Sequence, residues 1–198
     1  AGLSGGDAKF EVLSARNAYS GWRNIVKKDI RMPSGNIATF DVVDQAEPSV
    51  AVFVWHTRSK TLTLIKEYAP GRESMMHGVV AGMYEVKKHA GPLEAAKFEL
   101  EEEAHLTGGT WHSLTESLKT TVSADKYSTN EFFCWLCVDP EVTTTPRPLD
   151  AEEFIEIERG IALSEAMGMI VRGEMSVVSG FVTMLAMEKL QNLGLLAR

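Results

Sequence analysis

Residues 81–106 read AGMYEVKKHAGPLEAAKFELEEEAHL, and they contain the most informative pattern of the chain. Gly91 and Pro92 predict the start of a helix, because proline fits the first turn of a helix. The helical pattern continues to His105. At about 100° per residue, the apolar side chains gather on one side of this helix: Leu93, Ala96, Leu100 and Ala104.

An acidic arc lies beside this apolar side. Glu99, Glu102 and Glu103 follow one another along it, whereas Glu94 and Glu101 fall on the opposite flank, nearer solvent. Carboxylates at this spacing repel one another and disfavour the helix. Magnesium binds carboxylate oxygens and would offset the repulsion, with manganese as the alternative ion. A solvated acidic face is the simpler interpretation, since such faces are common on surface helices.

Composition limits the class of protein. The chain has 198 residues, of which 44% are hydrophobic and 24% charged, and these values suit one soluble globular domain with a small N-terminal subdomain. The formal net charge of −7 argues against a nucleic-acid backbone as the main partner. No apolar run approaches the ~20 residues of a membrane helix, so we expect no membrane partner.

Strand patterns surround the helix. The stretch 22–43 predicts a hairpin with its turn at 33–36, and 49–55 with 61–68 predict a second one. Residues 132–138 and 153–157 predict further strands. A C-terminal helix is expected to begin at a Ser164 cap and end near Gly173, and another to span about 177–193, with an apolar stripe of Val178, Phe181, Val182 and Leu185. The order predicts a layered α/β (α+β) fold with a mixed sheet.

Three segments follow from this pattern. Residues 1–8 (AGLSGGDA) resemble a flexible tail, either an expression remnant or a stub left by processing. Residues 9–47 are expected to form an N-terminal β subdomain, and 48–198 the main domain. The two cysteines, Cys134 and Cys137, lie three apart on a predicted strand and face opposite sides, so we expect core packing rather than a disulfide or a shared metal. They favour a reducing compartment.

The helix and the residues before it resemble the Nudix box, GX5EX7REUXEEXGU with U aliphatic. Ala81-Gly82 resembles its opening, and Glu99 to Glu103 (ELEEE) matches its EUXEE core. The resemblance implies a Nudix-like α/β/α sandwich and magnesium held by Glu99, Glu102 and Glu103. It also implies that the backbone carbonyl of Ala81 contributes to the metal site.

The resemblance to the ADP-sugar branch of this family covers roughly Trp22 to Leu190. It rests on SGWRNIVKKDIRMPSG, EYAPGRESMMHGVVAG, TVSADKYSTNEFFCW, LDAEEFIEI and the closing helices. It implies that Trp22 and an aromatic near Phe40 stack on the adenine, and that the N-terminal sheet is exchanged across a homodimer. Packing of Trp22 in the hairpin or at a dimer contact is the alternative.

Four positions depart from the family pattern. Phe98 stands where the box has an arginine that braces the glutamates, and His105 stands where a glycine closes the helix. The loop 86–90 is about two residues too long, so counting back places Ala90 at the first box glutamate, with Glu85 as a substitute. Gly78 stands where the branch often has an acidic residue.

The late acidic segment offers a general base. Its candidates are Glu152, Glu153 and Glu156; strand alternation separates Glu153 from Glu156, and the resemblance favours Glu153. A solvated loop carboxylate is the alternative. Arg72 is a candidate for gripping a phosphate by bidentate hydrogen bonds, with an ordinary surface arginine as the alternative.

The sequence therefore predicts metal-dependent hydrolysis of the pyrophosphate bond of a nucleoside-diphosphate sugar, such as ADP-ribose or ADP-glucose, giving AMP and a sugar phosphate. The alternative is a catalytically impaired Nudix-fold protein that binds nucleotides or serves as a scaffold, which Phe98 and His105 favour. We expect a cytoplasmic protein, or one of an organelle stroma or matrix if the N-terminus is a processed transit stub.

Overall fold

The computed structural model describes residues 9–149 and 153–197. The expected tail at 1–8 and the candidate base Glu152 lie outside these residues. The chain divides into two compact units, one of residues 1–46 with 123–130, the other of 47–122 with 131–198.

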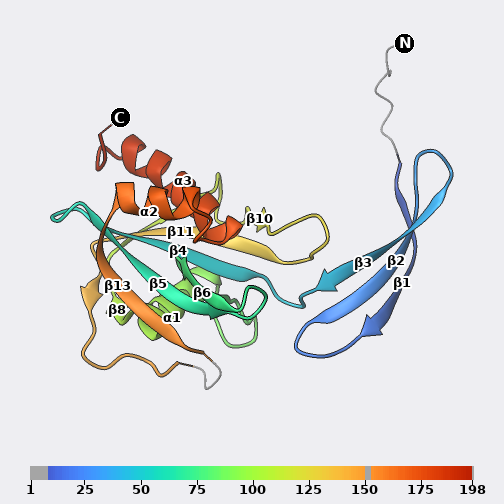
Figure 1. The fold of residues 1–198 in the computed structure, drawn as a ribbon, viewed down its shortest axis with the longest axis horizontal. Helices are drawn as coiled ribbons and strands as arrows, with labels where there is room; N and C mark the ends of the chain where they lie inside the picture. The colour runs from blue at the N-terminus through green and yellow to red at the C-terminus, as the bar shows by residue number, and fades with distance from the viewer. Residues whose placement is uncertain (1–8, 150–152, 198) are drawn as a thin grey trace, which may run out of the picture. The chain divides into compact units, whose positions relative to one another are not determined.

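The first unit is built on a three-stranded antiparallel sheet in the order β1-β2-β3 (Figure 1). Its strands are β1 (Glu11–Tyr19), β2 (Asn24–Arg31) and β3 (Ile37–Asp44). The hairpin of β2 and β3 confirms the sequence prediction, and β1 extends it by a strand for which no bounds were predicted. Segment 123–130 is tied to β3, because Val43 donates its N–H to Tyr127 O and accepts from Thr129 N–H.

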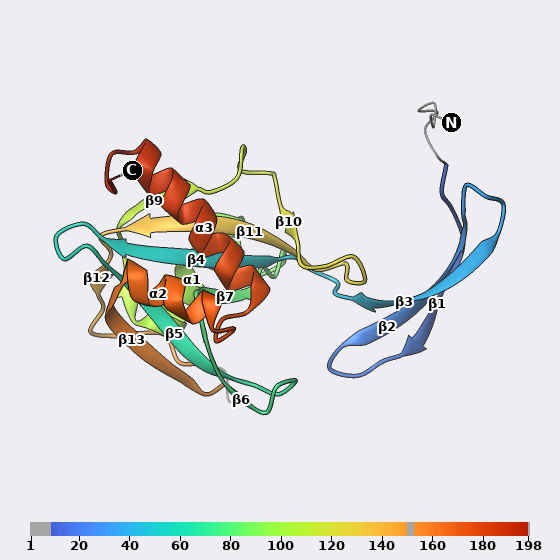
Figure 2. The same cartoon turned by 45° about the horizontal axis from the view of Figure 1, so that its top comes forward.

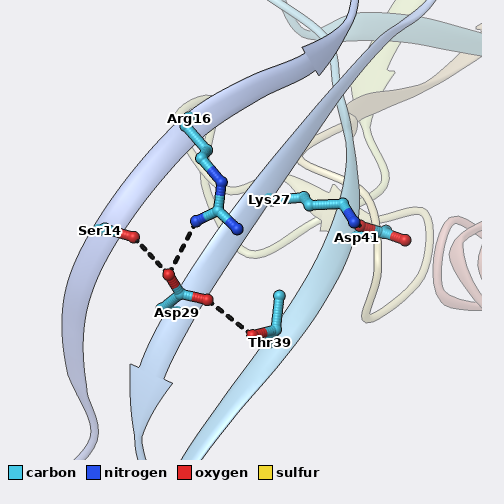
Figure 3. A network of polar contacts seen from close by, with 6 residues as sticks. All are labelled: Ser14, Arg16, Lys27, Asp29, Thr39 and Asp41. Carbon is cyan, nitrogen blue, oxygen red and sulfur yellow. Dashed lines mark hydrogen bonds and ion pairs between the residues drawn. The ribbon is translucent and has the colours of Figure 1, made fainter.

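Asp29 joins all three strands of this sheet. Its carboxylate accepts hydrogen bonds from Ser14 Oγ at 2.7 Å, Arg16 at 2.8 Å and Thr39 Oγ1 at 2.7 Å (Figure 3). These donors, Thr39 first, lower the pKa of Asp29 to about 2. Two hydroxyl groups and one guanidinium therefore stabilise the charged form of Asp29.

The second unit contains a mixed eight-stranded sheet. Its main path runs β10 (Val122–Ser123), β11 (Glu131–Val138), β4 (Ser49–His56), β5 (Thr61–Ala69) and β13 (Ile155–Ala162). Strands β4 and β11 are parallel, whereas β5 is antiparallel to both β4 and β13. Three further strands pair off this path: β6 (Ser74–Gly78) with β5, β7 (Val80–Met83) with β4, and β9 (Thr110–Ser113) with β11. Strands β8 (Leu106–Thr107) and β12 (Glu141–Val142) form a separate pair.

Helices cover both faces of this sheet. Helix α1 (Pro92–Ala104) lies on one face, and α2 (Leu163–Val171) and α3 (Val177–Asn192) lie on the other (Figures 1 and 2). Strand β4 is buried on both faces, since Val50, Val52 and Val54 face α1 while the alternate residues face α2 and α3. The predicted α/β/α sandwich with a mixed sheet is confirmed.

Some sequence predictions of the elements need correction. The β4–β5 hairpin pairs over only three positions, because β4 then pairs with β7 and β5 with β6. Strand β13 covers 155–162 rather than 153–157. Ala162, not Ser164, caps α2, and it does so without a side-chain hydrogen bond. Of the predicted stripe on α3, Val182 is buried and Val178 packs against the core, but Phe181 is 43% exposed; the buried side continues through Ala186 and Leu190.

The cysteine prediction is confirmed. Cys134 and Cys137 are both free and buried, and they belong to the clusters on opposite faces of the sheet. Within the described residues, no helix has the length and apolar character needed to cross a membrane.

Candidate functional site

Helix α1 is held at both ends. Near its start, Glu94 accepts a 2.6 Å hydrogen bond from the N–H of Ala90. At its end, His105 takes the left-handed conformation (φ 51°), and its N–H donates to Leu100 O. Arg159 of β13 also donates to Ala104 O at 2.8 Å. The histidine thus adopts the conformation that glycine usually supplies at this position.

Glu103 is the buried carboxylate of the helix. It is 3% exposed, and its Oε2 accepts a 3.0 Å hydrogen bond from the backbone N–H of Ala81 on β7. Burial raises its pKa well above the usual range, and the charge of Glu99 raises it further. The Ala81 N–H opposes this shift, while the charges of Glu153 and Glu67 add to it. An ionised Glu103 would therefore need a cation nearby.

Glu99 lies against the same strand. Its carboxyl group occupies the space that a Cβ would fill at Gly82, so only glycine leaves room for it there. Ala81 therefore supplies a backbone donor for Glu103, and Gly82 leaves room for the carboxyl group of Glu99. Glu102 lies on the same helix and is half-buried.

Sequence reasoning missed one carboxylate. Glu67 on β5 pairs across the sheet with Ile155 of β13, and its charge reaches Glu103. Its own pKa is raised by burial. The signal was available, because Glu67 is two residues beyond the buried Ile65, which belongs to the cluster that faces α1.

Glu153 lies just before β13 begins. Ile155, two residues later, packs into the α1-side cluster, and Glu153 acts electrostatically on Glu103. Glu156 pairs with Lys66 and is exposed. Of these two carboxylates, Glu153 is the one whose charge acts on Glu103.

The site thus gathers carboxylates from three elements around Glu103. Their hard oxygen atoms are the donor type that divalent cations such as Mg2+ prefer. Across residues 9–149 and 153–197, however, no three His, Cys, Asp or Glu side chains converge into a ready metal-binding group. The donor chemistry fits a divalent cation, but the carboxylate groups would have to move closer together to bind one.

A pocket of about 230 Å3 opens beside this site. It is lined by strands β5, β6 and β7 and helix α3, with Glu67, His77, Gly78, Ala81 and Ser179 among its residues. Gly78, one of the departures noted above, is part of its wall and faces Ser179. His77 on the same wall makes a 2.7 Å contact with Glu158.

The other predicted site residues belong to other elements of the chain. Arg72 is exposed in the turn between β5 and β6. Trp22 is 83% exposed in the first unit, in the turn between β1 and β2. Phe40 on β3 is half-buried, and the centroid of its ring lies 6.5 Å from that of Tyr127.

Two departures from the box take part in other contacts. Phe98 stacks under Arg147, whose Cζ lies 3.7 Å from the ring centroid. Glu85, the substitute for the first box glutamate, pairs with Lys88 at 2.6 Å. Both side chains are therefore engaged in packing or pairing on the loops around α1.

Comparisons with known proteins agree with this architecture. A solved structure described as "Crystal structure of ADP compounds hydrolase" matches with a TM-score of 0.75 and 19% identity, over 98% of this chain and 100% of that one. At this identity the likeness shows the fold. No curated protein matches the sequence. The NUDIX domain family model matches residues 46–175, which include α1 and the strands around it, and the chain therefore belongs to the NUDIX domain family.

Proposed function

We propose that this protein hydrolyses the pyrophosphate bond of a nucleoside-diphosphate sugar, such as ADP-ribose or ADP-glucose, with a divalent cation, Mg2+ or Mn2+. The products are AMP and a sugar phosphate. Family membership supports hydrolysis with a divalent cation, and the fold-level likeness to an ADP compounds hydrolase is compatible with the choice of substrate.

One observation carries the proposal. Glu103 is buried, is held by a backbone N–H, and has three other carboxylates within electrostatic range. A carboxylate with this environment is costly in a purely structural role, because each neighbour opposes its ionisation. Perturbed carboxylates of this kind are typical of functional sites.

Each residue has a role in the proposed reaction. Glu99, Glu102, Glu103 and the carbonyl of Ala81 would hold the cation, which would neutralise charge on the pyrophosphate oxygens and lower the pKa of a bound water. Glu153 would orient the attacking water and accept its proton. The water oxygen forms a bond to one phosphorus, and the bridging P–O bond breaks, which frees the other phosphate as the leaving group.

The substrate groups are assigned by the resemblance and by exposure. Trp22, with its 83% exposed ring, and Phe40 would stack on the base. Arg72 would hold a phosphate through its guanidinium. The 230 Å3 pocket beside Glu67 and Ala81 is below the usual size for a whole ligand, so we assign it to one part of the substrate.

We also propose that the protein is a homodimer through its N-terminal sheet. Every residue of β1 is exposed, and the first unit carries exposed apolar side chains along its strands and turns: Phe10, Val12, Leu13, Tyr19, Trp22, Ile37 and Val43. An apolar surface of this kind favours association with another chain. Light scattering coupled to size exclusion would measure the mass, and a monomer at micromolar concentration would refute this assignment.

The alternative is a nucleotide-binding or scaffold protein without turnover. Phe98 and His105, which depart from the Nudix box, favour it, and so does the observation that no three metal-binding side chains of the described residues converge. In that case the carboxylates would bind a cation weakly or not at all, and a nucleotide would remain intact.

The test is an incubation of the purified protein with Mg2+ and a panel of nucleoside-diphosphate compounds, with AMP and its equivalents measured. We expect metal-dependent release from at least one ADP-sugar, and loss of that release in Glu102→Gln and Glu103→Gln. Binding of a compound without product would favour the alternative. Turnover that survives both substitutions would refute the site.

A further inference from the structure

Phe98 is in contact with two segments that do not belong to its own helix. On one side the guanidinium of Arg147 lies 3.7 Å from its ring centroid. In addition, the ring of His89 meets it edge-on, with centroids 5.2 Å apart and an interplanar angle of 80°. A cation over an aromatic face and an edge-to-face ring pair are both attractive arrangements.

Arg147 also holds a second residue of α1. Its Nε lies 3.4 Å from Oε2 of Glu101, three residues after Phe98 and therefore on the same side of the helix. The segment that carries Arg147 is fixed to the end of the helix as well, because Thr143 N–H donates to His105 O and β12 pairs with β8. Residues 141–147 therefore follow the outer side of α1.

His89 connects Phe98 to the loop before the helix. Its ring also lies near Tyr84, with centroids 6.2 Å apart, and Tyr84 meets Phe133 of β11 edge-on. Phe98 is therefore the ring at which the 85–91 loop and the 141–147 segment are both attached to α1.

We propose that Phe98 is a positioning residue, whose ring holds Arg147 and His89 on α1 and thereby sets where Glu99 and Glu103 lie against β7. This inference rests on the proposed function for the roles of the glutamates. It differs from it in assigning a role to a side chain that touches neither substrate nor cation.

An arginine at position 98 would disturb these contacts. Phe98→Arg would place a second guanidinium beside Arg147 and remove the ring on which it stacks, so like charges would drive the segment away. We therefore expect Phe98→Arg to lower kcat about 10- to 100-fold, since small misplacements of reacting groups are costly. A higher kcat in Phe98→Arg would overturn the inference.

The main test separates positioning from general packing. We expect Phe98→Ala and Arg147→Ala each to lower kcat about 10-fold with little change in KM, Phe98→Tyr to restore most of the rate, and the double Ala variant to be no worse than either single one. Additive losses, or equal changes in kcat and KM, would overturn the proposal. Matched controls are Phe181→Ala on α3 and Arg172→Ala, whose side chain pairs with Glu174, and neither should change kcat.

A binding measurement keeps the inference testable without turnover. Mn2+ affinity, followed by electron paramagnetic resonance, should weaken several-fold in Phe98→Ala and Arg147→Ala and stay the same in Phe181→Ala. If the unaltered protein binds Mn2+ but cleaves nothing, the proposed function fails while this comparison still decides the inference. Equal affinities in all variants, or no Mn2+ binding in the unaltered chain, would overturn it.

Discussion

Asp29 and Glu103 are two carboxylates in opposite electrostatic conditions. Asp29, on the central strand of the N-terminal sheet, accepts hydrogen bonds from side chains of both neighbouring strands, and its pKa falls to about 2. Glu103, in the second unit, has one backbone donor and three acidic neighbours, and its pKa rises. The first carboxylate is fully provided with donors by the protein, and the second is not.

The difference separates a structural carboxylate from a candidate functional one. Donors around Asp29 make ionisation favourable, so its charge stabilises the folded sheet. At Glu103, burial and like charges make ionisation unfavourable until a cation is present. Removing the charge should therefore raise the stability of the metal-free protein at Glu103 and lower the stability of the sheet at Asp29.

Glu103→Gln carries the largest expected effect. Turnover should fall about 1,000-fold, because a charged ligand is lost where charge develops in the reaction. The metal-free protein should become more stable at neutral pH, with a Tm a few degrees higher, since the amide keeps an acceptor for Ala81 N–H without a buried charge. Activity assays and thermal melts in EDTA measure both, with Glu188→Gln on the exposed side of α3 as the control. Parallel loss of stability and activity would assign Glu103 a structural role.

The unfolding free energies of the unaltered protein and of Glu103→Gln should also differ in their dependence on pH. The folded pKa of Glu103 lies above its unfolded value, so folding binds a proton and the unfolding free energy falls as pH rises above about 4.5. Urea titrations of the metal-free protein between pH 4 and 8 should show this decline, and Glu103→Gln should reduce it. An identical pH profile in both proteins would contradict the raised pKa.

Gly82→Ala should have the next largest effect. The added Cβ would occupy the space of the Glu99 carboxyl group, which must then move, and we expect a loss of about 10- to 100-fold in turnover. Gly180→Ala is the matched control, because its Cβ meets only ordinary contacts of 3.6 Å or more with Ile170. If Gly82→Ala and Gly180→Ala are equally active, the position of Glu99 does not matter for the reaction.

Much of the second unit followed from the sequence, because its patterns are local. The apolar side of α1, the buried strands and the opposite faces of Cys134 and Cys137 depend on periodicity, and the structure confirms them. Contacts between distant segments could not be predicted. Nothing in the sequence places Arg147 over Phe98 or Arg159 on Ala104 O, since these pairs form only when the chain folds.

The errors have physical causes too. Ser164 resembles a helix cap, yet α2 begins at Leu163 because β13 continues to Ala162 and the helix follows it directly. Helical spacing of apolar residues predicts Phe181 on the buried stripe, whereas the smaller Gly180, Thr183 and Ala186 are the residues that are buried. The sequence pattern of residues 61–68 predicts only a strand of a hairpin, so it does not single out Glu67, although alternation from Ile65 places this residue toward α1.

The stability that Asp29 gives to the N-terminal sheet should depend on pH in the acidic range. Because its folded pKa is lowered to about 2 from 3.8, its contribution to stability is present above about pH 4 and is lost as pH falls toward 2. The protection factors of the β1–β3 amides should fall over this interval, and Asp29→Asn should show lower protection at pH 6 with less dependence on pH. Unchanged exchange in Asp29→Asn would mean that the three strands do not depend on this network.

His105→Gly has the smallest expected effect, and it tests whether the region of Glu103 also holds backbone strain. His105 has φ 51°, a conformation that costs a residue with a Cβ about 1 kcal/mol more than glycine. We expect the glycine variant to melt ~2–4 °C higher, partly offset by the greater freedom of glycine in the unfolded chain. His105→Ala keeps the penalty and should show no gain, which makes it the matched control. If His105→Gly is less stable than His105→Ala, then contacts of the imidazole outweigh the strain, and the end of α1 is held by its side chain rather than by its backbone.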